Sequence, residues 1–341
     1  MVNKRQEIPY LNLLRVIAIY FVILLHCVSP FLQKVGLFGQ RAWLISDCIN
    51  AITRMGVPCL FMISGYLLLS DERSLDIKSF YKKRLPRILI PLFVWNVLYF
   101  IYDRVITKQT IKPMEFLSQL FNNGSSYHLW FVYTIFGIYL IIPFLKRIVD
   151  ACTQRQVLIL LSIILLTSSI RPLVNEFTSI NFFLFDPLIE GYVGFVLVGY
   201  LLGSNQLSRK MRGLIYIGGV IGLLIGIYGN YVLSSPSELN LFFNGGYQIN
   251  QYLAAIALFT AVKQIPIRQN SVFFRFINSL SKLTFGIYFI HILVLVHYTS
   301  YWVIEGSPFR VTMTIFFVTA SISTVVIYIL SKIKFVKKLI M

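Results

Sequence analysis

LNLLRVIAIYFVILLHCVS, residues 11–29, is an apolar run interrupted by one arginine and one histidine. An α-helix of about 20 residues crosses roughly 30 Å of hydrocarbon, so this run is long enough to span a membrane. Runs of the same kind recur between short polar stretches, and the chain therefore predicts an all-α, polytopic transmembrane bundle. About ten spans are expected, at residues 11–29, 43–69, 88–106, 128–145, 156–170, 186–203, 213–233, 248–262, 283–304 and 310–330.

The composition agrees with a chain that lies mostly in lipid. Of 341 residues, 57% are hydrophobic and 13% are charged, whereas soluble domains carry about 25% charged residues. The net charge of +18 comes from bases between the apolar runs, not from one polar face, which argues against a nucleic-acid partner. The four cysteines show no CxxC spacing, so no metal site is expected. The protein is expected to lie in the lipid bilayer of the cell (plasma) membrane.

Charge distribution predicts how the chain crosses the membrane. With the N-terminus in the cytosol, 22 of the 31 Lys and Arg residues fall in cytosolic segments and seven in outer ones. Because positive loops stay in the cytosol, both termini are expected there. The longest polar stretches, 107–127 and 234–247, are too short to bury a core of their own. Residues 1–341 are therefore expected to form a single integral membrane domain with no appended soluble domain.

Arg15 and His26 share one stripe of the first span. They are eleven residues apart, and at about 100° per residue they return to nearly the same face, about 16 Å apart along the axis. Ionisable groups at membrane depth usually face a cavity or a pathway, which makes both residues candidates for function. The alternatives are that Arg15 snorkels to the interface and that His26 makes an interhelical hydrogen bond.

Further bases lie in the second and third spans. Arg54 has few carboxylates within reach, so it fits an anionic ligand, or else it pairs with an acid or with backbone carbonyls. Lys83, Arg84 and Arg87 stand at the entrance of the third span, where they could hold a nucleotide phosphate or lipid headgroups or act only as a topological signal.

Aromatic and histidine residues mark the outer side. His128 and Trp130 open the fourth span and could contact an extracytosolic sugar, or anchor the helix at the interface. Tyr288 and His291 share a face of the ninth span, where we predict a packing role.

Five segments in this order resemble the acyltransferase-3 family of integral membrane acyltransferases. They read LNLLRVIAIYFVILLH (11–26), VPCLFMISGYLLL (57–69), FYKKRLPRILIP (80–91), HLWFVYTIFGIYL (128–140) and SLSKLTFGIYFIH (279–291). Such proteins modify surface polysaccharides, lipid-linked sugars and peptidoglycan. Many members carry an acidic residue shortly before the arginine of the first motif, whereas this chain has Asn12 there.

The resemblance implies roles for particular residues. Arg15 and His26 are expected to be the paired functional residues of the first span, and Arg84 or Arg87 to support donor binding. Ser64 and Gly65 are expected to shape the second helix near the site.

On this basis we predict an O-acyltransferase that uses acyl-CoA, acetyl by default and succinyl as the alternative, without a metal. The phosphates would lie near Arg15, Arg84 and Arg87, and Lys83 and Ser64 would complete the donor site. His26 would act as general base on a hydroxyl of a cell-envelope glycan or lipid-linked sugar, or would carry the acyl group itself. The alternative class is a transporter or flippase of a lipid-linked sugar or anionic solute. The oligomeric state is not predicted.

Overall fold

The computed structural model describes residues 7–122, 124–178, 191–301 and 306–341, and within these ranges the regular elements are all helices. The start of the predicted span 186–203 and the end of 283–304 lie outside the described residues. The longer helices are α1 (Pro9–Leu32), α2 (Arg41–Thr53), α3 (Gly56–Leu69), α5 (Pro86–Thr107), α7 (Trp130–Ala151), α8 (Gln154–Leu165), α11 (Arg209–Leu233), α12 (Ile249–Lys263), α14 (Thr284–Tyr301) and α15 (Pro308–Leu330).

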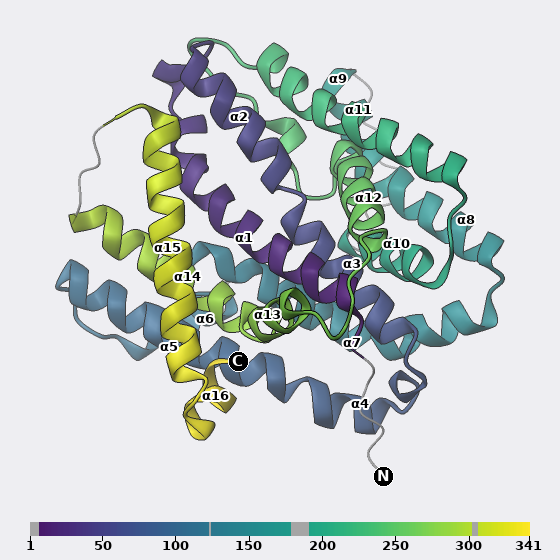
Figure 1. Ribbon diagram of the computed structural model, residues 1–341. Helices are drawn as coiled ribbons and strands as arrows, with labels where there is room; N and C mark the ends of the chain where they lie inside the picture. Colours follow the sequence, from purple (N-terminus) through teal and green to yellow (C-terminus); the bar gives the residue numbers. More distant parts are fainter. Residues whose placement is uncertain (1–6, 123, 179–190, 302–305) are drawn as a thin grey trace.

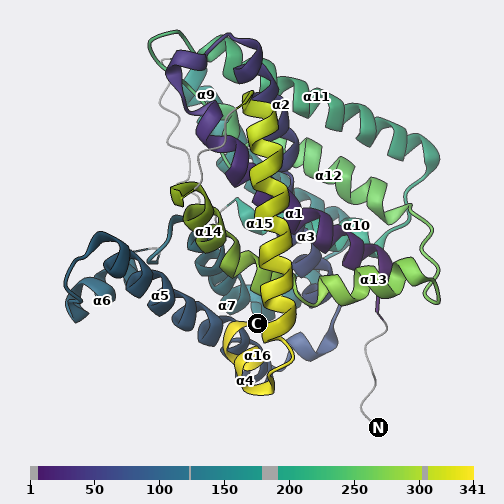
Figure 2. The same cartoon turned by 60° about the vertical axis from the view of Figure 1, so that its left-hand side comes forward.

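Shorter helices connect and cover these. They are α4 (Ile77–Arg84), α6 (Pro113–Phe121), α9 (Arg171–Phe177), α10 (Tyr192–Ser204), α13 (Val272–Ser281) and α16 (Lys334–Ile340). Single turns are η1 (Val35–Leu37), η2 (Glu72–Ser74), η3 (Tyr127–Leu129), η4 (Leu166–Ile170) and η5 (Phe242–Asn244). Figures 1 and 2 show α1 in the interior of the bundle, with α2, α3, α13 and α15 around it.

Fewer helices are long enough to cross a membrane than the ten apolar runs suggest. Among the described residues, seven pass by length and composition, and the pair α13–α14, bent by 63°, would make an eighth. The runs at 186–203 and 248–262 correspond to α10 and α12, which have 13 and 15 residues. Most of α10 is buried inside the bundle. A helix that is apolar all round can be a core helix as well as a span, and sequence alone does not separate the two.

The second span is interrupted between Thr53 and Gly56, a few residues before Pro58. Pro58 itself lies in the first turn of α3, where proline is tolerated. The junction lets α3 begin directly against α1, because a Cβ on Gly56 would lie 2.6 Å from the Ala18 carbonyl oxygen. Close approach to α1 is thus the physical reason for a glycine at this point.

The crossing of α3 and α10 depends on a second glycine. A Cβ on Gly65 would stand 2.0 Å from the carbonyl oxygen of Val196, and backbone cannot move aside as a side chain can. Small residues allow membrane helices to approach closely in this way. Gly65 therefore serves the packing of α3 against α10.

We expect Gly65→Ala to destabilise the bundle, by about 1–3 kcal/mol, as overpacking typically does. The matched control is Gly137→Ala in α7, because nothing lies within 4 Å of the Cβ it would add. The measurement is the midpoint of thermal aggregation of the detergent-purified proteins. Equal midpoints for the two variants would contradict the packing role.

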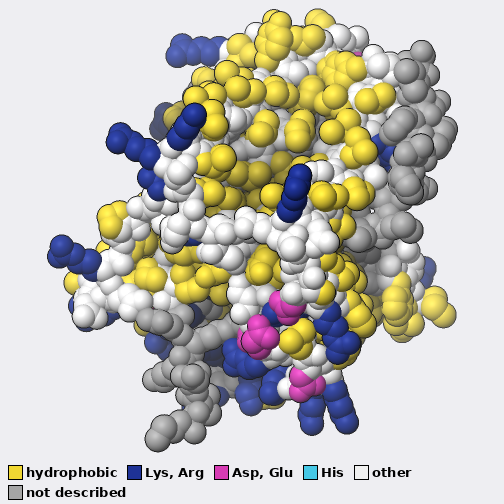
Figure 3. All heavy atoms as spheres, turned by 90° about the vertical axis from the view of Figure 1, so that its right-hand side faces the viewer, with side chains coloured by type: hydrophobic (Ala, Val, Ile, Leu, Met, Phe, Trp, Pro, Cys, Tyr) yellow, Lys and Arg dark blue, Asp and Glu magenta, His cyan; other side chains and the backbone are white. Residues whose placement is uncertain are grey.

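Charge is concentrated at one end of the bundle. Figure 3 shows a largely hydrophobic flank above a lower end where basic and acidic side chains gather. That end carries α4 and α16, and α1 begins there (Figures 1 and 2). We call it the basic end, defined by Lys82, Lys83, Arg84, Arg87, Lys334, Lys337 and Lys338. The flank exposes large apolar side chains of α11, including Leu214, Ile217 and Leu224, which suit contact with hydrocarbon.

Candidate active site

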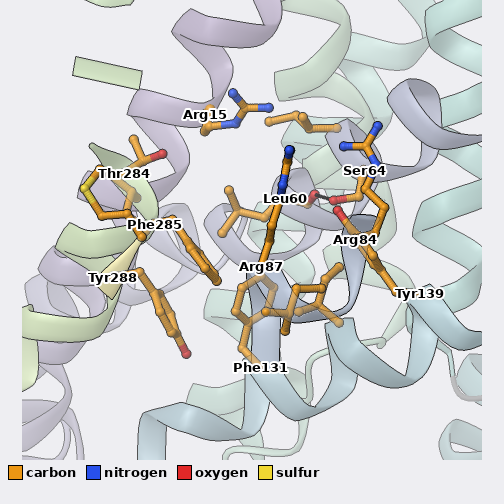
Figure 4. Close-up of a pocket in the computed structure, with 15 residues that line it drawn as sticks. Arg15, Leu60, Ser64, Arg84, Arg87, Phe131, Tyr139, Thr284, Phe285 and Tyr288 are labelled. Atoms are coloured by element: carbon orange, nitrogen blue, oxygen red, sulfur yellow. Dashed lines mark hydrogen bonds between the residues drawn. The ribbon is translucent and has the colours of Figure 1, made fainter. Parts of the chain in front are cut away.

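A cavity of about 310 Å³ lies between α1, α3, α4, α5, α7 and α14. Arg15, Arg84 and Arg87 line it, and Figure 4 shows their nitrogen ends turned toward the same space. We call it the arginine cavity. Ser64 also lines it and donates to the Leu60 carbonyl at 3.0 Å. None of the described residues that line it has a carboxylate side chain. Such a site favours an anionic ligand.

Local sequence explains why two arginines of the basic end face this cavity. α4 ends at Arg84 and α5 begins two residues later at Pro86, a helix start that needs no backbone N–H. The backbone stays helical through Leu85, so Arg84 and Arg87 are three residues apart on one face. Aromatic side chains form the facing wall, among them Phe131 of α7 and Phe285 of α14.

A second cavity of about 580 Å³ shares Arg84 and Arg87 with the first. Its other lining residues are Asp71, Arg73, Asp76, Ser79, Phe80 and Lys83. Lys83 therefore belongs to this second, more polar cavity and does not line the arginine cavity. Arg84 is partly neutralised there, because its guanidinium lies 3.8 Å from the Asp71 carboxylate.

Three histidines from distant segments meet deeper in the bundle. His26 of α1, His128 of η3 and His291 of α14 form what we call the histidine cluster. The ring of His291 lies 5.3 Å from that of His26 and 5.1 Å from that of His128, between centroids. Within the described ranges, no group of three His, Cys, Asp or Glu residues is arranged to hold a metal ion.

Hydrogen bonds orient this cluster. Nδ1 of His291 donates to the Tyr288 carbonyl at 2.5 Å, which leaves its Nε2 as an acceptor. Nε2 of His291 and Nε2 of His128 are both buried without a hydrogen-bond partner in the described part of the chain. The Tyr127 hydroxyl lies 3.3 Å from Nδ1 of His26. A hydroxyl in this place can set the tautomer of His26 and leave Nε2 for chemistry.

Tyr288 joins the two regions. It lines the arginine cavity, and its hydroxyl donates to the backbone carbonyl of His128. The predicted site residues thus fall into two adjoining groups, with Arg15 in the cavity and His26 in the cluster. Trp130 belongs to neither group and packs on Tyr192, with ring centroids 5.5 Å apart.

Some residues of this site were not predicted. Tyr127 immediately precedes a predicted segment and Tyr139 lies within it, and neither carries a further sequence signal. His291 and Tyr288 were assigned to packing; both are buried, yet His291 also lies beside His26. At the position where an acid is common in the family, Asn12 donates to Asn278 of α13 at 3.1 Å, which links α1 to α13.

The fold and the site together define a multi-pass helical membrane protein in which a cationic cavity lies next to a cluster of three histidines. The sequence pattern described as "Acyltransferase domain" matches residues 8–332. The chain therefore belongs to the acyltransferase-3 family, as its motifs indicated, and is a multi-pass membrane protein.

One curated protein is similar to part of this chain. The succinoglycan biosynthesis protein ExoH of Rhizobium meliloti (strain 1021) is 31% identical over 105 residues, which cover 29% of this chain and 28% of that protein. No solved structure matches the chain.

Proposed function

We propose that this protein transfers an acyl group, acetyl by default, from acyl-CoA to a hydroxyl of a cell-envelope glycan or lipid-linked sugar. One observation carries the proposal: three arginines line a cavity in which no described lining residue has a carboxylate side chain, and that cavity is linked to His26 through Tyr288 and His291. The first feature suits an anionic donor, and the second suits proton transfer beside it.

Donor binding is the role proposed for the arginine cavity. Guanidinium groups bind phosphate through charge-assisted, often bidentate, hydrogen bonds. Arg15, Arg84 and Arg87 would hold the phosphates of coenzyme A, and Lys83 would extend the same field into the second cavity. Ser64 is proposed to shape the cavity wall. The basic end would then face the cytosol, in agreement with the bias of positive loops toward that side.

The acyl end of the donor would lie near His26. Arg15 and His26 are about 16 Å apart along α1, a distance that the extended arm of coenzyme A could cover. Apolar and aromatic side chains, including Ile135 and Phe285, line the route as far as Tyr288. Such a lining suits an uncharged arm and a thioester.

The proposed reaction uses His26 as general base. The acceptor hydroxyl gives its proton to His26, its oxygen bonds to the thioester carbon, and the carbon–sulfur bond breaks. The leaving thiolate then takes the proton from His26. Tyr127 would orient the imidazole, and His128 and Trp130 would lie on the acceptor side. A second route, in which His26 first carries the acyl group, uses the same residues.

A glycan acceptor is supported by the relative whose name places it in succinoglycan biosynthesis. Family membership favours acyl transfer over the transporter reading, although buried arginine and histidine would also suit a solute pathway.

The test compares cells with and without the protein, by mass spectrometry of the surface glycan. We expect equal glycan yield and loss of acyl groups when the protein is absent. Purified protein in vesicles, given labelled acetyl-CoA and an extract of lipid-linked sugars, should transfer label to the sugars. Loss of the glycan itself, with normal acylation of what remains, would favour transport.

A further inference from the structure

Arg54 lies at the junction of α2 and α3 and is not part of the arginine cavity. Its Nη1 donates to the backbone carbonyl of Asn244 at 2.5 Å. Pairing with a backbone carbonyl was one of the two expectations for this residue, and the structure confirms it. The bond uses only one of the five N–H donors of the guanidinium. Nε is buried without a hydrogen-bond acceptor among the described residues, so the group has donors to spare.

The partner of Arg54 belongs to a buried polar cluster. Oδ1 of Asn244 accepts from Asn50 at 3.0 Å and from Asn230 at 3.1 Å. Asn230 also donates to Oδ1 of Asp47 at 3.0 Å. We call the side-chain amides of Asn50, Asn230 and Asn244, together with the carboxylate of Asp47, the carboxamide cluster. Asp47, Asn50 and Asn230 are each 0% exposed, so the hydrogen bonds that hold Asn244 lie inside the bundle.

Helix register places this cluster near the level of His26 along the bundle. α2 and α3 run antiparallel to α1, and two contacts set their alignment. The Trp43 indole donates to the Leu32 carbonyl at 3.0 Å, and Gly56 abuts the Ala18 carbonyl oxygen. The segment 43–56 and the segment 18–32 of α1 connect these two contacts and are nearly equal in length. Asn50 therefore lies near the level of His26. The guanidinium of Arg54 reaches the same level, since Asn244 contacts both Arg54 and Asn50.

Electrostatics agree with this placement. The charge of Arg54 is near enough to act on both His26 and the Asp47 carboxylate. The opposite charge of Asp47 offsets that of Arg54 in part, and Oδ2 of Asp47 accepts no hydrogen bond in the described part of the chain. A partly buried guanidinium whose Nη1 is held by a backbone carbonyl, and whose Nε has no acceptor among the described residues, is a preorganised site for negative charge that forms during a reaction.

We propose that Arg54 is a catalytic residue of the transfer reaction, where its guanidinium stabilises the oxyanion formed on the acyl carbonyl. This inference rests on the proposed function. When the acceptor oxygen adds to the thioester carbon, the electron pair of the carbonyl π bond moves onto the oxygen. When that electron pair returns to re-form the carbonyl, the carbon–sulfur bond breaks. The leaving thiolate then takes the proton that His26 accepted from the hydroxyl. Arg54 donates to the oxygen only while it is negative, so it acts on turnover more than on binding.

The test is steady-state kinetics of Arg54→Gln and Arg54→Lys with acetyl-CoA and the acceptor, in vesicles of equal protein content. We expect kcat of Arg54→Gln to fall about 100-fold or more, the loss typical of a missing oxyanion donor, with both KM values nearly unchanged. Arg54→Lys keeps the charge without the planar fork and should recover part of that loss. The matched control, Arg104→Gln at the end of α5, removes an arginine with a carboxylate partner at 3.1 Å and should leave kcat within about twofold.

A charge-neutral double variant separates catalysis from structure. If Arg54 served only to offset Asp47, then Asp47→Asn combined with Arg54→Gln would remove both charges and restore turnover. The oxyanion role predicts that the double variant stays as slow as Arg54→Gln. Restored turnover, an unchanged kcat in Arg54→Gln, or a rise confined to the KM for acetyl-CoA would each overturn the proposal. Failure of the wild-type protein to consume any acyl-CoA would instead refute the proposed function.

Discussion

His26→Ala leaves the protein in the membrane at normal level and removes acyl groups from the surface glycan, while total glycan yield stays unchanged. This is the expected result because a positioned base typically contributes about 10²- to 10⁴-fold to the rate. His26 reaches the cluster from one face of α1, and its ring does not carry the packing of the bundle: Ile19, Ile23 and Cys27 on the same helix are buried, whereas His26 is partly accessible.

The control for this experiment is His297→Ala. His297 lies in α14, as His291 does, but outside the histidine cluster. Its Nδ1 lies 3.4 Å from the hydroxyl of Tyr102. It should retain normal acylation. Mass spectrometry of the glycan measures both quantities in the same sample. Full acylation in the His26→Ala strain would refute the assignment of His26 as base or acyl carrier.

The second large effect concerns the donor. Arg15→Gln combined with Arg87→Gln should raise the KM for acetyl-CoA by about 100-fold or more. Charge-assisted hydrogen bonds contribute about 1.5–3 kcal/mol each, and a factor of ten corresponds to about 1.4 kcal/mol. The matched control is Lys78→Gln, which removes an exposed base of α4 that lines neither cavity.

A truncated donor makes this prediction specific. S-acetylpantetheine lacks the nucleotide phosphates, so it cannot use the guanidinium groups of the arginine cavity. The wild-type protein should bind it weakly, and the double variant should bind it about as weakly as the wild type does. If the double variant binds acetyl-CoA and S-acetylpantetheine more weakly than the wild type by the same factor, then Arg15 and Arg87 support the fold of the site and do not bind the phosphates. Added salt should reduce the difference between the donors, because screening weakens partly exposed charge pairs.

Much of the fold could be predicted because its signals are local. About ten spans were expected, and a described helix corresponds to each of the ten apolar runs, although only seven, or eight with the bent pair α13–α14, are long and apolar enough among the described residues to cross a membrane. The pairing of Arg15 and His26 on one stripe follows from helical geometry alone. The entrance cluster of Arg84 and Arg87 could likewise be located from one short segment. These features depend on spacing within a helix, which is written directly in the chain.

Other features depend on which helices become neighbours. Whether a short apolar helix faces lipid or protein is decided by packing, as for α10, which has 13 residues and is mostly buried inside the bundle. The contact between Tyr127 and His26 joins residues 101 positions apart, and that between Arg54 and Asn244 joins residues 190 apart. No periodicity encodes such pairs.

By itself, the sequence determined that this protein is a helical membrane bundle of the acyltransferase-3 type, and that Arg15 and His26 share a helix face. Only the tertiary structure decided that the arginines of α1, α4 and α5 line one cavity, that His291 lies beside His26, and that Asn244 of the carboxamide cluster accepts a hydrogen bond from Arg54. The physical reason is range: hydrophobic runs act within one helix, whereas buried polar groups find their partners only when distant helices pack together.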